Sequence, residues 1–399
     1  MNYMDALKKY NEGRDKWCVP RKGTEDYLKI RSMMIHPVMK KRGTRGTQGT
    51  QGIQETEKYK VREWVPLDKI KKSAILSVNP NAIDFLSLSD NLKYIDYRQL
   101  SKNKNPKAIE LLKGKPKKID WTALSRNTNT EAIDLLEKNI DKIDWEELSG
   151  NTNPKAIELL KANSKYINWD IFSGNIAITA VAFLSVKDNY NNINWTALSG
   201  NTNLKAIKLL EKNIDKIDWE ELSGNTNPKA IKLLEKNIDN KKIDWDLISQ
   251  NPNAIYLLKN RIEYEKSMKM NITKINWAYL SENSKAIELL KEYDFLIRWD
   301  YLPDNTNPKV IKLLEKQIKE DPDSIDWEKL SGNPNAIKLL DRNKDKIVWA
   351  YLSSNSGAIE LLKERIEYEI KLKKKDYALL SNKIDWDSLA ANPSIFTIY

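Results

Sequence analysis

The chain of 399 residues contains one cysteine, one histidine and only five phenylalanines. The single Cys18 excludes an internal disulfide framework and is typical of a reducing compartment. With His36 as the one histidine beside this one cysteine, the sequence argues against both a Cys/His zinc site and a Cys-His nucleophile. No apolar run approaches the ~20 residues of a membrane span, and no glycine-rich phosphate loop follows a strand pattern. These absences predict a protein without metal, cofactor, enzyme activity or membrane segment.

Charge is distributed unevenly along the chain. Lys and Arg number 67 against 56 Asp and Glu, a formal net charge of +11. Residues 1–72 hold 18 basic and 9 acidic side chains, whereas residues 73–399 hold 49 and 47. The basic excess therefore lies in an N-terminal arm. Because phosphate binding requires clustered Lys and Arg, the even balance of the remainder argues against nucleic-acid binding there.

From about Ser73 onward the sequence is a tandem repeat, which has to be settled before any local interpretation. One copy, residues 143–160, reads Ile-Asp-Trp-Glu-Glu-Leu-Ser-Gly-Asn-Thr-Asn-Pro-Lys-Ala-Ile-Glu-Leu-Leu. The aromatic position holds Tyr97, Trp121, Trp145, Trp169, Trp195, Trp219, Trp245, Trp277, Trp299, Trp327, Trp349 and Trp386. Six residues later comes an Asn: Asn103, Asn127, Asn151, Asn175, Asn201, Asn225, Asn251, Asn283, Asn305, Asn333, Asn355 and Asn392.

The spacing of the aromatics defines about 13 repeats. Successive aromatics are mostly 22 to 26 residues apart, with longer spacings of 28, 32 and 37. A leading copy keeps Leu76 and Asn79 but has Ser73 at the aromatic position, which is typical of a terminal capping repeat without a preceding neighbour. The two longest spacings carry related inserts, 261–265 and 365–369, whose composition predicts a helix extended by a turn or two.

Each copy carries the signals of two short helices. Asp144 precedes the aromatic and is a good N-cap for a first helix that begins at Trp145. Gly150 and the Asn after it end this helix, because both tolerate the left-handed conformation of a C-terminal cap. Asn153 caps the second helix, and Pro154 takes its first position, where the missing N–H costs nothing. The Ala-Ile-x-Leu-Leu run that follows supplies the apolar side.

This pattern predicts an all-α fold, an α-solenoid of short helix-turn-helix repeats in one elongated domain. Some leucine-rich repeats share the repeat length, but their Leu-x-x-Leu-x-Leu strand signature is missing here. We expect a small helical N-terminal segment at residues 1–35, a flexible basic Gly/Thr/Gln linker at 36–60, and the repeat solenoid at 61–399.

The repeated Trp and Asn each have a structural and a functional interpretation. A Trp series suits stacking on nucleic-acid bases, but its fixed place beside the same Leu favours a core ladder. An Asn series suits a polar binding row, but Asn in such positions more often satisfies backbone groups at a turn. We therefore assign the eleven Trp, together with Asn127, Asn151, Asn201 and Asn225, to a structural ladder.

Binding is expected at positions that differ between copies, chiefly the two residues after the aromatic. Three of these hold tyrosine, Tyr279, Tyr301 and Tyr351, and Tyr is well suited to protein interfaces. Surface packing is the equal alternative. In the N-terminal arm the candidate contacts to an acidic partner or to phosphate are basic. They are Arg21, Lys22, Lys40, Lys41 and Arg42.

The unit Ile-Asp-Trp-x-x-Leu-Ser-x-Asn-Pro-Asn-Ala-Ile-x-Leu-Leu resembles the tandem Trp/Asn repeats that are abundant in giant viruses, the nucleocytoplasmic large DNA viruses. The resemblance covers roughly Ser73 to the end, and residues 392–396 resemble the terminal form of such arrays. Residues 10–13 and 17–24 resemble a short N-terminal element of proteins from those viruses. The resemblance implies a viral protein made in an infected cell, without a settled activity.

Residues 119–162 nearly repeat residues 193–236, so whole blocks of three units have been copied. A unique catalytic constellation rarely survives such copying, whereas a stacked scaffold does. The sequence therefore predicts a non-enzymatic scaffold for protein-protein interaction, serving host interaction or assembly of the virion or viral factory. The alternative is a nucleic-acid-binding protein that acts through residues 1–60. We expect a monomer in the host cytoplasm, the viral factory or the virion.

Overall fold

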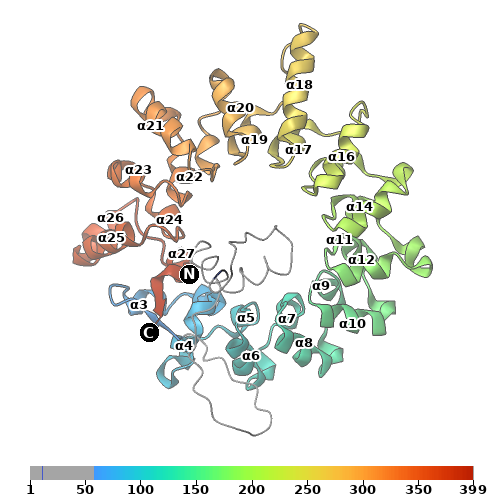
Figure 1. Cartoon of the computed structure of the whole chain (residues 1–399). Coiled ribbons are helices and arrows are strands. Elements are labelled where there is room, and N and C mark those ends of the chain that lie inside the picture. The colour runs from blue at the N-terminus through green and yellow to red at the C-terminus, as the bar shows by residue number, and fades with distance from the viewer. Residues whose placement is uncertain (1–10, 12–57, 399) are drawn as a thin grey trace. The chain divides into compact units, whose positions relative to one another are not determined.

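The computed structural model describes residue 11 and residues 58–398, and the latter form a closed ring of helical repeats (Figure 1). The helices and most of the linker predicted for the N-terminal arm lie outside the described residues. Strand β1 (Tyr59–Val61) pairs antiparallel with β2 (Phe396–Ile398) and joins the two ends of the array. Tyr59 and Lys60, which the sequence assigned to the linker, therefore belong to the ring.

The repeats form an all-α solenoid in which a short first helix lies on the inner side of the ring and a second helix on the outer side (Figure 1). The first helices are α5 (Tyr97–Leu100), α7 (Trp121–Arg126), α9 (Trp145–Ser149), α11 (Trp169–Gly174), α13 (Trp195–Gly200), α15 (Trp219–Ser223), α17 (Trp245–Gln250), α19 (Trp277–Glu282), α22 (Trp327–Gly332), α24 (Trp349–Leu352) and α27 (Trp386–Ala391). In the leading unit and the Trp299 unit, 3-10 turns take this place: η1 (Ala74–Val78) and η10 (Leu302–Asp304).

The second helices vary more in length than the first. They are α4 (Ile83–Leu86), α6 (Pro106–Lys113), α8 (Thr130–Glu137), α10 (Pro154–Ala162), α12 (Ile178–Leu184), α14 (Leu204–Glu211), α16 (Pro228–Lys236), α18 (Ile255–Ser267), α20 (Ile287–Glu292), α21 (Val310–Glu320), α23 (Ile337–Asp341) and α25 (Ile359–Lys371). The predicted extension at the inserts is confirmed, because α18 and α25 each have 13 residues. Two further helices lie outside this pattern: α3 (Leu67–Ile70) and α26 (Lys374–Leu379).

A 3-10 turn follows most second helices, so a unit usually has three elements where the helix-turn-helix pattern predicted two. These turns are η3 (Ser89–Tyr94), η4 (Pro116–Lys118), η5 (Ile140–Lys142), η6 (Ser164–Tyr166), η7 (Lys187–Asn192), η8 (Ile214–Lys216), η9 (Asp294–Leu296), η11 (Pro322–Ser324) and η12 (Lys344–Lys346). Two others, η2 (Pro80–Ala82) and η13 (Pro393–Ile395), follow the ladder Asn of the leading and last units.

The helix starts agree with the predicted caps, and the first helix ends at Gly150 as predicted, but the predicted left-handed conformation there is wrong. Asp144 Oδ1 accepts a hydrogen bond from the Glu147 amide at 3.2 Å, and Asn153 Oδ1 accepts one from the Lys155 amide at 2.8 Å. Gly150, however, has φ −83, in the right-handed region. Where the ladder Asn is itself the C-cap, as at Asn127, the chain turns to an extended conformation with φ −71 and ψ 119. The amide side chain, not a left-handed residue, then holds the turn.

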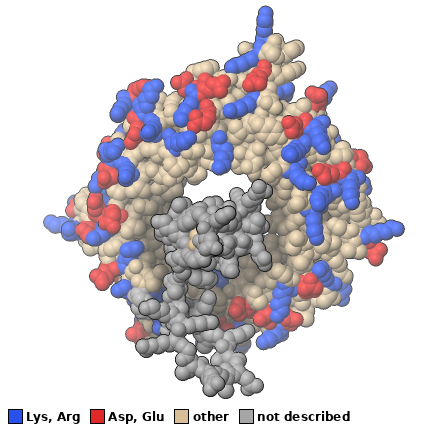
Figure 2. Space-filling model, viewed as in Figure 1, with Lys and Arg blue, Asp and Glu red and all other residues tan. Residues whose placement is uncertain are grey.

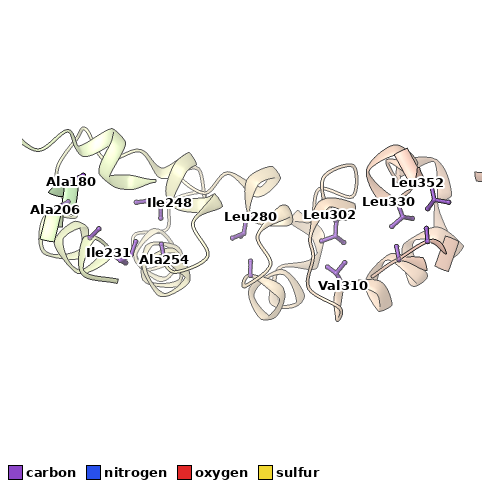
Figure 3. Packing of buried hydrophobic residues seen from close by; sticks show 14 of the residues in the cluster. Ala180, Ala206, Ile231, Ile248, Ala254, Leu280, Leu302, Val310, Leu330 and Leu352 are labelled. Carbon is purple, nitrogen blue, oxygen red and sulfur yellow. The ribbon is translucent and has the colours of Figure 1, made fainter. Parts of the chain in front are cut away.

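The innermost column of the core is aliphatic. Leu148, three residues after its aromatic, and Ala156, on the second helix, are both fully buried. Figure 3 shows the same arrangement further along the ring, where Leu302 of the inner layer lies opposite Val310 of the outer layer. Ala in most second helices allows the two layers to approach closely.

The sequence predicted that the Trp rings form a core ladder. In the structure they pack against the aliphatic core and do not form its centre. Trp219 and Trp349 are 7% exposed, and the other nine repeat Trp are partly buried. Trp145 stacks on Tyr166 of its own unit with ring centroids 4.8 Å apart. The Trp145 indole therefore covers the edge between its first helix and the 3-10 turn that ends its unit.

Buried Asn and Ser side chains link each unit to its neighbour. Asn151, 2% exposed, donates from Nδ2 to the carbonyls of Ser125 (2.9 Å) and Asn127 (3.1 Å) in the preceding unit. Its Oδ1 accepts from the Asn153 amide at 2.9 Å, so the expectation that Asn satisfies the turn backbone is confirmed. Ser125 Oγ donates to the Trp121 carbonyl at 2.8 Å and accepts from the Asp144 amide at 3.1 Å.

The Asn ladder also closes the ring. Asn79 of the leading unit donates to the carbonyl of Ala390 in the last unit at 3.0 Å. The predicted capping repeat therefore has a preceding neighbour, and the predicted open, elongated rod is wrong. The reason is geometric: a small rotation between units adds up along a solenoid, and its size cannot be read from residue spacing.

Candidate functional site

The exposed face of the first helices lines the inner side of the ring. In these helices the third and fourth residues after the aromatic are buried, whereas the first, second and fifth remain mostly accessible. The outer helices cover the opposite side, so the accessible face points toward the opening (Figure 1). We define the inner wall as the segments from the residue before each aromatic to the fifth residue after it.

The inner wall surrounds an opening that is visible in Figure 2. Helices pack about 9 Å apart, so a closed row of thirteen has a circumference of about 120 Å. After one helix width of about 10 Å is subtracted from the diameter, the opening is roughly 25 Å across. Such a width accommodates an extended peptide, a helix or a small domain.

The inner wall is strongly acidic. It contains 18 acidic side chains and five basic ones, which leaves 29 acidic and 44 basic side chains for the rest of residues 73–399. The acidic residues are Asp96, Asp120, Asp144, Glu146, Glu147, Asp170, Asp218, Glu220, Glu221, Asp244, Asp246, Glu282, Asp300, Asp304, Asp326, Glu328, Asp385 and Asp387. Figure 2 shows Lys and Arg around the outer rim, where Asp and Glu also lie. The even overall balance therefore conceals two layers of opposite charge.

Part of this negative charge also holds neighbouring units in register. Asp144 Oδ2 accepts from Thr122 Oγ1 of the preceding unit at 3.0 Å. Glu147 forms a bidentate ion pair with Arg126, and this hydrogen bond followed by the charge of Glu147 raises the pKa of the guanidinium. Glu146, by contrast, is an exposed side chain one residue after its aromatic. Positions of this last kind leave their charge accessible to solvent.

Two of the three candidate tyrosines are accessible on the inner wall. Tyr279 is 36% exposed and Tyr351 is 47% exposed. The hydrogen bond to Glu328 and, after it, the charge of Glu328 raise the pKa of the Tyr351 hydroxyl. Tyr301 is half-buried, and Lys329 Nζ lies 4.2 Å and the Arg298 guanidinium 5.3 Å from its ring centroid.

Lys329 is an inner-wall residue that was not among the sites predicted from the sequence. Its ammonium lies 3.2 Å from Asp304 and 3.6 Å from Glu282, so it connects three successive units. The sequence does distinguish this residue, because Lys329 is the one lysine at the second position after a repeat aromatic. It makes the wall around the tyrosines less acidic than the sector from α9 to α17.

The remaining predicted sites belong to the N-terminal arm. Arg21, Lys22, Lys40, Lys41 and Arg42 lie outside the described residues, as do Cys18 and His36. Within residues 58–398, no group of three or more His, Cys, Asp or Glu side chains is arranged to hold a metal ion. In the same part of the chain, no helix combines the length and apolar character that crossing a membrane requires.

Comparison with known proteins adds no relative to this picture. No family model matches the sequence, no curated protein matches it, and no solved structure matches it.

Proposed function

We propose that the ring is a non-enzymatic scaffold for protein-protein interaction and that its inner wall binds the partner. One observation carries this proposal. The units repeat their buried Leu, Ser and Asn almost without change, whereas the accessible positions after the aromatic differ, and ring closure gathers those positions on one continuous wall.

The charge of the wall defines the partner's surface. The net negative charge of this wall favours a segment rich in Lys and Arg, because complementary potentials steer association and exclude wrong partners. The same charge repels phosphate, so it opposes binding of nucleic acid within the opening. Tyr279 and Tyr351 supply apolar contact area in the less acidic sector.

The ring also bears on assembly and location. Both end units are covered by each other, so no open solenoid end is left to stack on a second copy; this supports the proposal of a monomer. The proposal of a viral protein in the host cytoplasm, viral factory or virion is supported by the repeat resemblance alone. Nucleic-acid binding by residues 1–60 also stays a prediction, because nearly all of that segment lies outside the described residues.

Site-specific photo-crosslinking in the cells that make the protein tests this proposal. A photoreactive phenylalanine replaces Tyr279 or Tyr351 on the inner wall, and matched controls replace Tyr264 or Tyr368 on the outer helices α18 and α25, which are 51% and 50% exposed. We expect a protein adduct from the inner positions that is lost when Glu146 and Glu220 are changed to Lys. Adducts from the outer positions alone, or adducts that survive this charge reversal, contradict the proposal.

A further inference from the structure

The duplicated blocks differ at few positions, and most differences fall on the outer helices. Residues 119–162 and 193–236 align without gaps and differ at eight positions. The differing pairs are Asp120/Asn194, Arg126/Gly200, Thr130/Leu204, Glu131/Lys205, Asp134/Lys208, Glu158/Lys232, Lys161/Glu235 and Ala162/Lys236. Six of the eight lie on second helices, α8 and α10 in the first block and α14 and α16 in the second. The first block is therefore an internal reference for the second.

The substitutions build two parallel rows of lysine. Lys205, Lys208 and Lys212 follow one face of α14 and its C-cap at spacings of three and four residues, and Lys229, Lys232 and Lys236 follow α16 in the same way. All six are exposed, and α14 and α16 are neighbours in the outer layer. The corresponding rows of the first block are Glu131, Asp134, Lys138 and Lys155, Glu158, Ala162. Six positive charges thus replace a nearly balanced set.

The lysine rows also lack the ion pairs of the first block. There, Lys155 pairs with Asp134 and, at 3.2 Å, with Glu137, while Lys161 pairs with Glu158 at 2.9 Å. None of the six lysines on α14 and α16 makes an ion pair with any residue of the described chain. Their charge is therefore available to a ligand.

A groove lies along the second row. It has a volume of about 690 Å³ and is lined by Lys229, Lys232 and Lys236 together with Ile214, Leu233 and Glu211. No aromatic side chain lines it. Proteins that hold single strands usually stack bases on aromatic rings, so this groove is built to contact a backbone and not bases.

We propose that the two lysine rows form a sequence-independent binding site for the phosphate backbone of double-stranded nucleic acid. Seven residues of helix extend over about 10 Å, and neighbouring helices lie about 10 Å apart. A duplex presents about six phosphate charges over such a length. Six unpaired ammonium groups on a convex rim match this charge density. The site lies on the opposite layer from the inner wall and does not depend on the function proposed for that wall.

An exchange between the two blocks tests the site in the full-length chain. The loss variant carries Lys205→Glu, Lys208→Asp, Lys232→Glu and Lys236→Ala, which are the residues that the first block has at the same places. The gain variant carries Glu131→Lys, Asp134→Lys, Glu158→Lys and Ala162→Lys. Because each residue already occupies an equivalent position in this chain, both variants are expected to fold, and circular dichroism verifies it.

The measurement is the affinity for a fluorescent 30-base-pair duplex of random sequence across a range of salt concentrations. We expect the loss variant to bind at least about tenfold more weakly at low salt, with a salt slope smaller by about 4, because each of the four lost phosphate contacts removes about one unit. The gain variant is expected to change both quantities in the opposite direction. Any contribution from the N-terminal arm is common to all three proteins and cancels in the comparison.

Several results overturn the proposal. Among them are no duplex binding by the parent chain, equal salt slopes in all three proteins, and competition by poly-glutamate as strong as that by the duplex. The last result assigns the rows to an acidic protein instead. Lysine acetylation followed by mass spectrometry gives an independent readout: the duplex is expected to protect Lys205, Lys208, Lys229 and Lys232, but not Lys155.

Discussion

Arg62 Nε donates a hydrogen bond to the carbonyl of Ser394 at 2.8 Å, which joins two residues 332 positions apart in the sequence. The Arg62 amide adds a second bond to the carbonyl of Ile395 at 2.9 Å. Together with the β1–β2 pairing, these contacts hold the first and last units side by side. The ring is thus closed by backbone pairing as well as by continued stacking of repeats.

The closure predicts that a disulfide forms between strands β1 and β2. Lys60 lies opposite Thr397 in the antiparallel register, so we expect Lys60→Cys with Thr397→Cys, in a Cys18→Ser background, to oxidise within one chain. A crosslink that closes a loop spanning nearly the whole chain stabilises by about 6 kcal/mol in the chain-entropy model. Mobility on a non-reducing gel and the thermal midpoint with and without reductant measure the effect. The control pair Lys60→Cys and Thr128→Cys is expected to stay reduced. If the array were an open rod, the pair at positions 60 and 397 would stay reduced as well.

The Asn ladder predicts a large effect of a small change. Asn151→Ala leaves the carbonyls of Ser125 and Asn127 and the amide of Asn153 without their partners. We expect a loss of about 2–4 kcal/mol of unfolding free energy, because each buried group left unsatisfied costs about 1–3 kcal/mol. Urea unfolding measures it. The neighbouring Thr152 is exposed, so Thr152→Ala is expected to change stability by less than about 0.5 kcal/mol; equal midpoints for the two variants contradict the ladder.

The long helix α18 contains a buried carboxylate whose removal is expected to destabilise the ring. Glu265 is fully buried, and its oxygens accept from Arg261 Nε at 2.8 Å and from the Thr273 amide at 3.1 Å. Breaking such a pair leaves a charge without its partner, so Glu265→Ala is expected to cost about 3–5 kcal/mol. Glu263 lies on the same helix and is exposed. Denaturant unfolding of Glu263→Ala, the matched control, is expected to resemble that of the parent chain.

Tyr256 is expected to ionise at unusually high pH. Burial and then its hydrogen bond to Glu235, at 3.1 Å, raise the pKa of the Tyr256 hydroxyl to about 12. A raised tyrosine pKa means that the folded state holds its proton more tightly than the unfolded state. The resulting stabilisation is complete below pH ~10, the unfolded pKa, and is lost as pH rises toward about 12. Ultraviolet titration is expected to show a late-ionising component that decreases by one tyrosine in Tyr256→Phe and shifts to lower pH in Glu235→Gln.

The local structure of a unit follows from its sequence because the deciding interactions are local. Asp144 and Asn153 cap the helices that they precede, and the insert 261–265 lengthens α18 as its composition predicts. These features involve residues two to four positions apart. The role of Asn151 was predicted only for its own turn, because its bonds to the preceding unit depend on how two units stack.

Features that depend on how many units are arranged together could not be predicted from the sequence. Ring closure needs the angle between units, and no residue encodes that angle alone. The partial exposure of Trp145 depends on how the following turn folds back over it. The lysine rows of α14 and α16 were concealed because the acidic inner wall balances them in the total charge. Once the two layers are separated in space, their opposite charges become apparent.

Closure of the ring constrains the number of repeat units in the protein. Thirteen units turn through a full circle, an average of about 28° each. Adding one copy lowers that average to about 26°. The rotation then has to change at every junction between units, or the contacts between the first and last units are lost. An open array grows or shrinks one copy at a time with little consequence, whereas in this molecule duplication and deletion are coupled across the whole circumference.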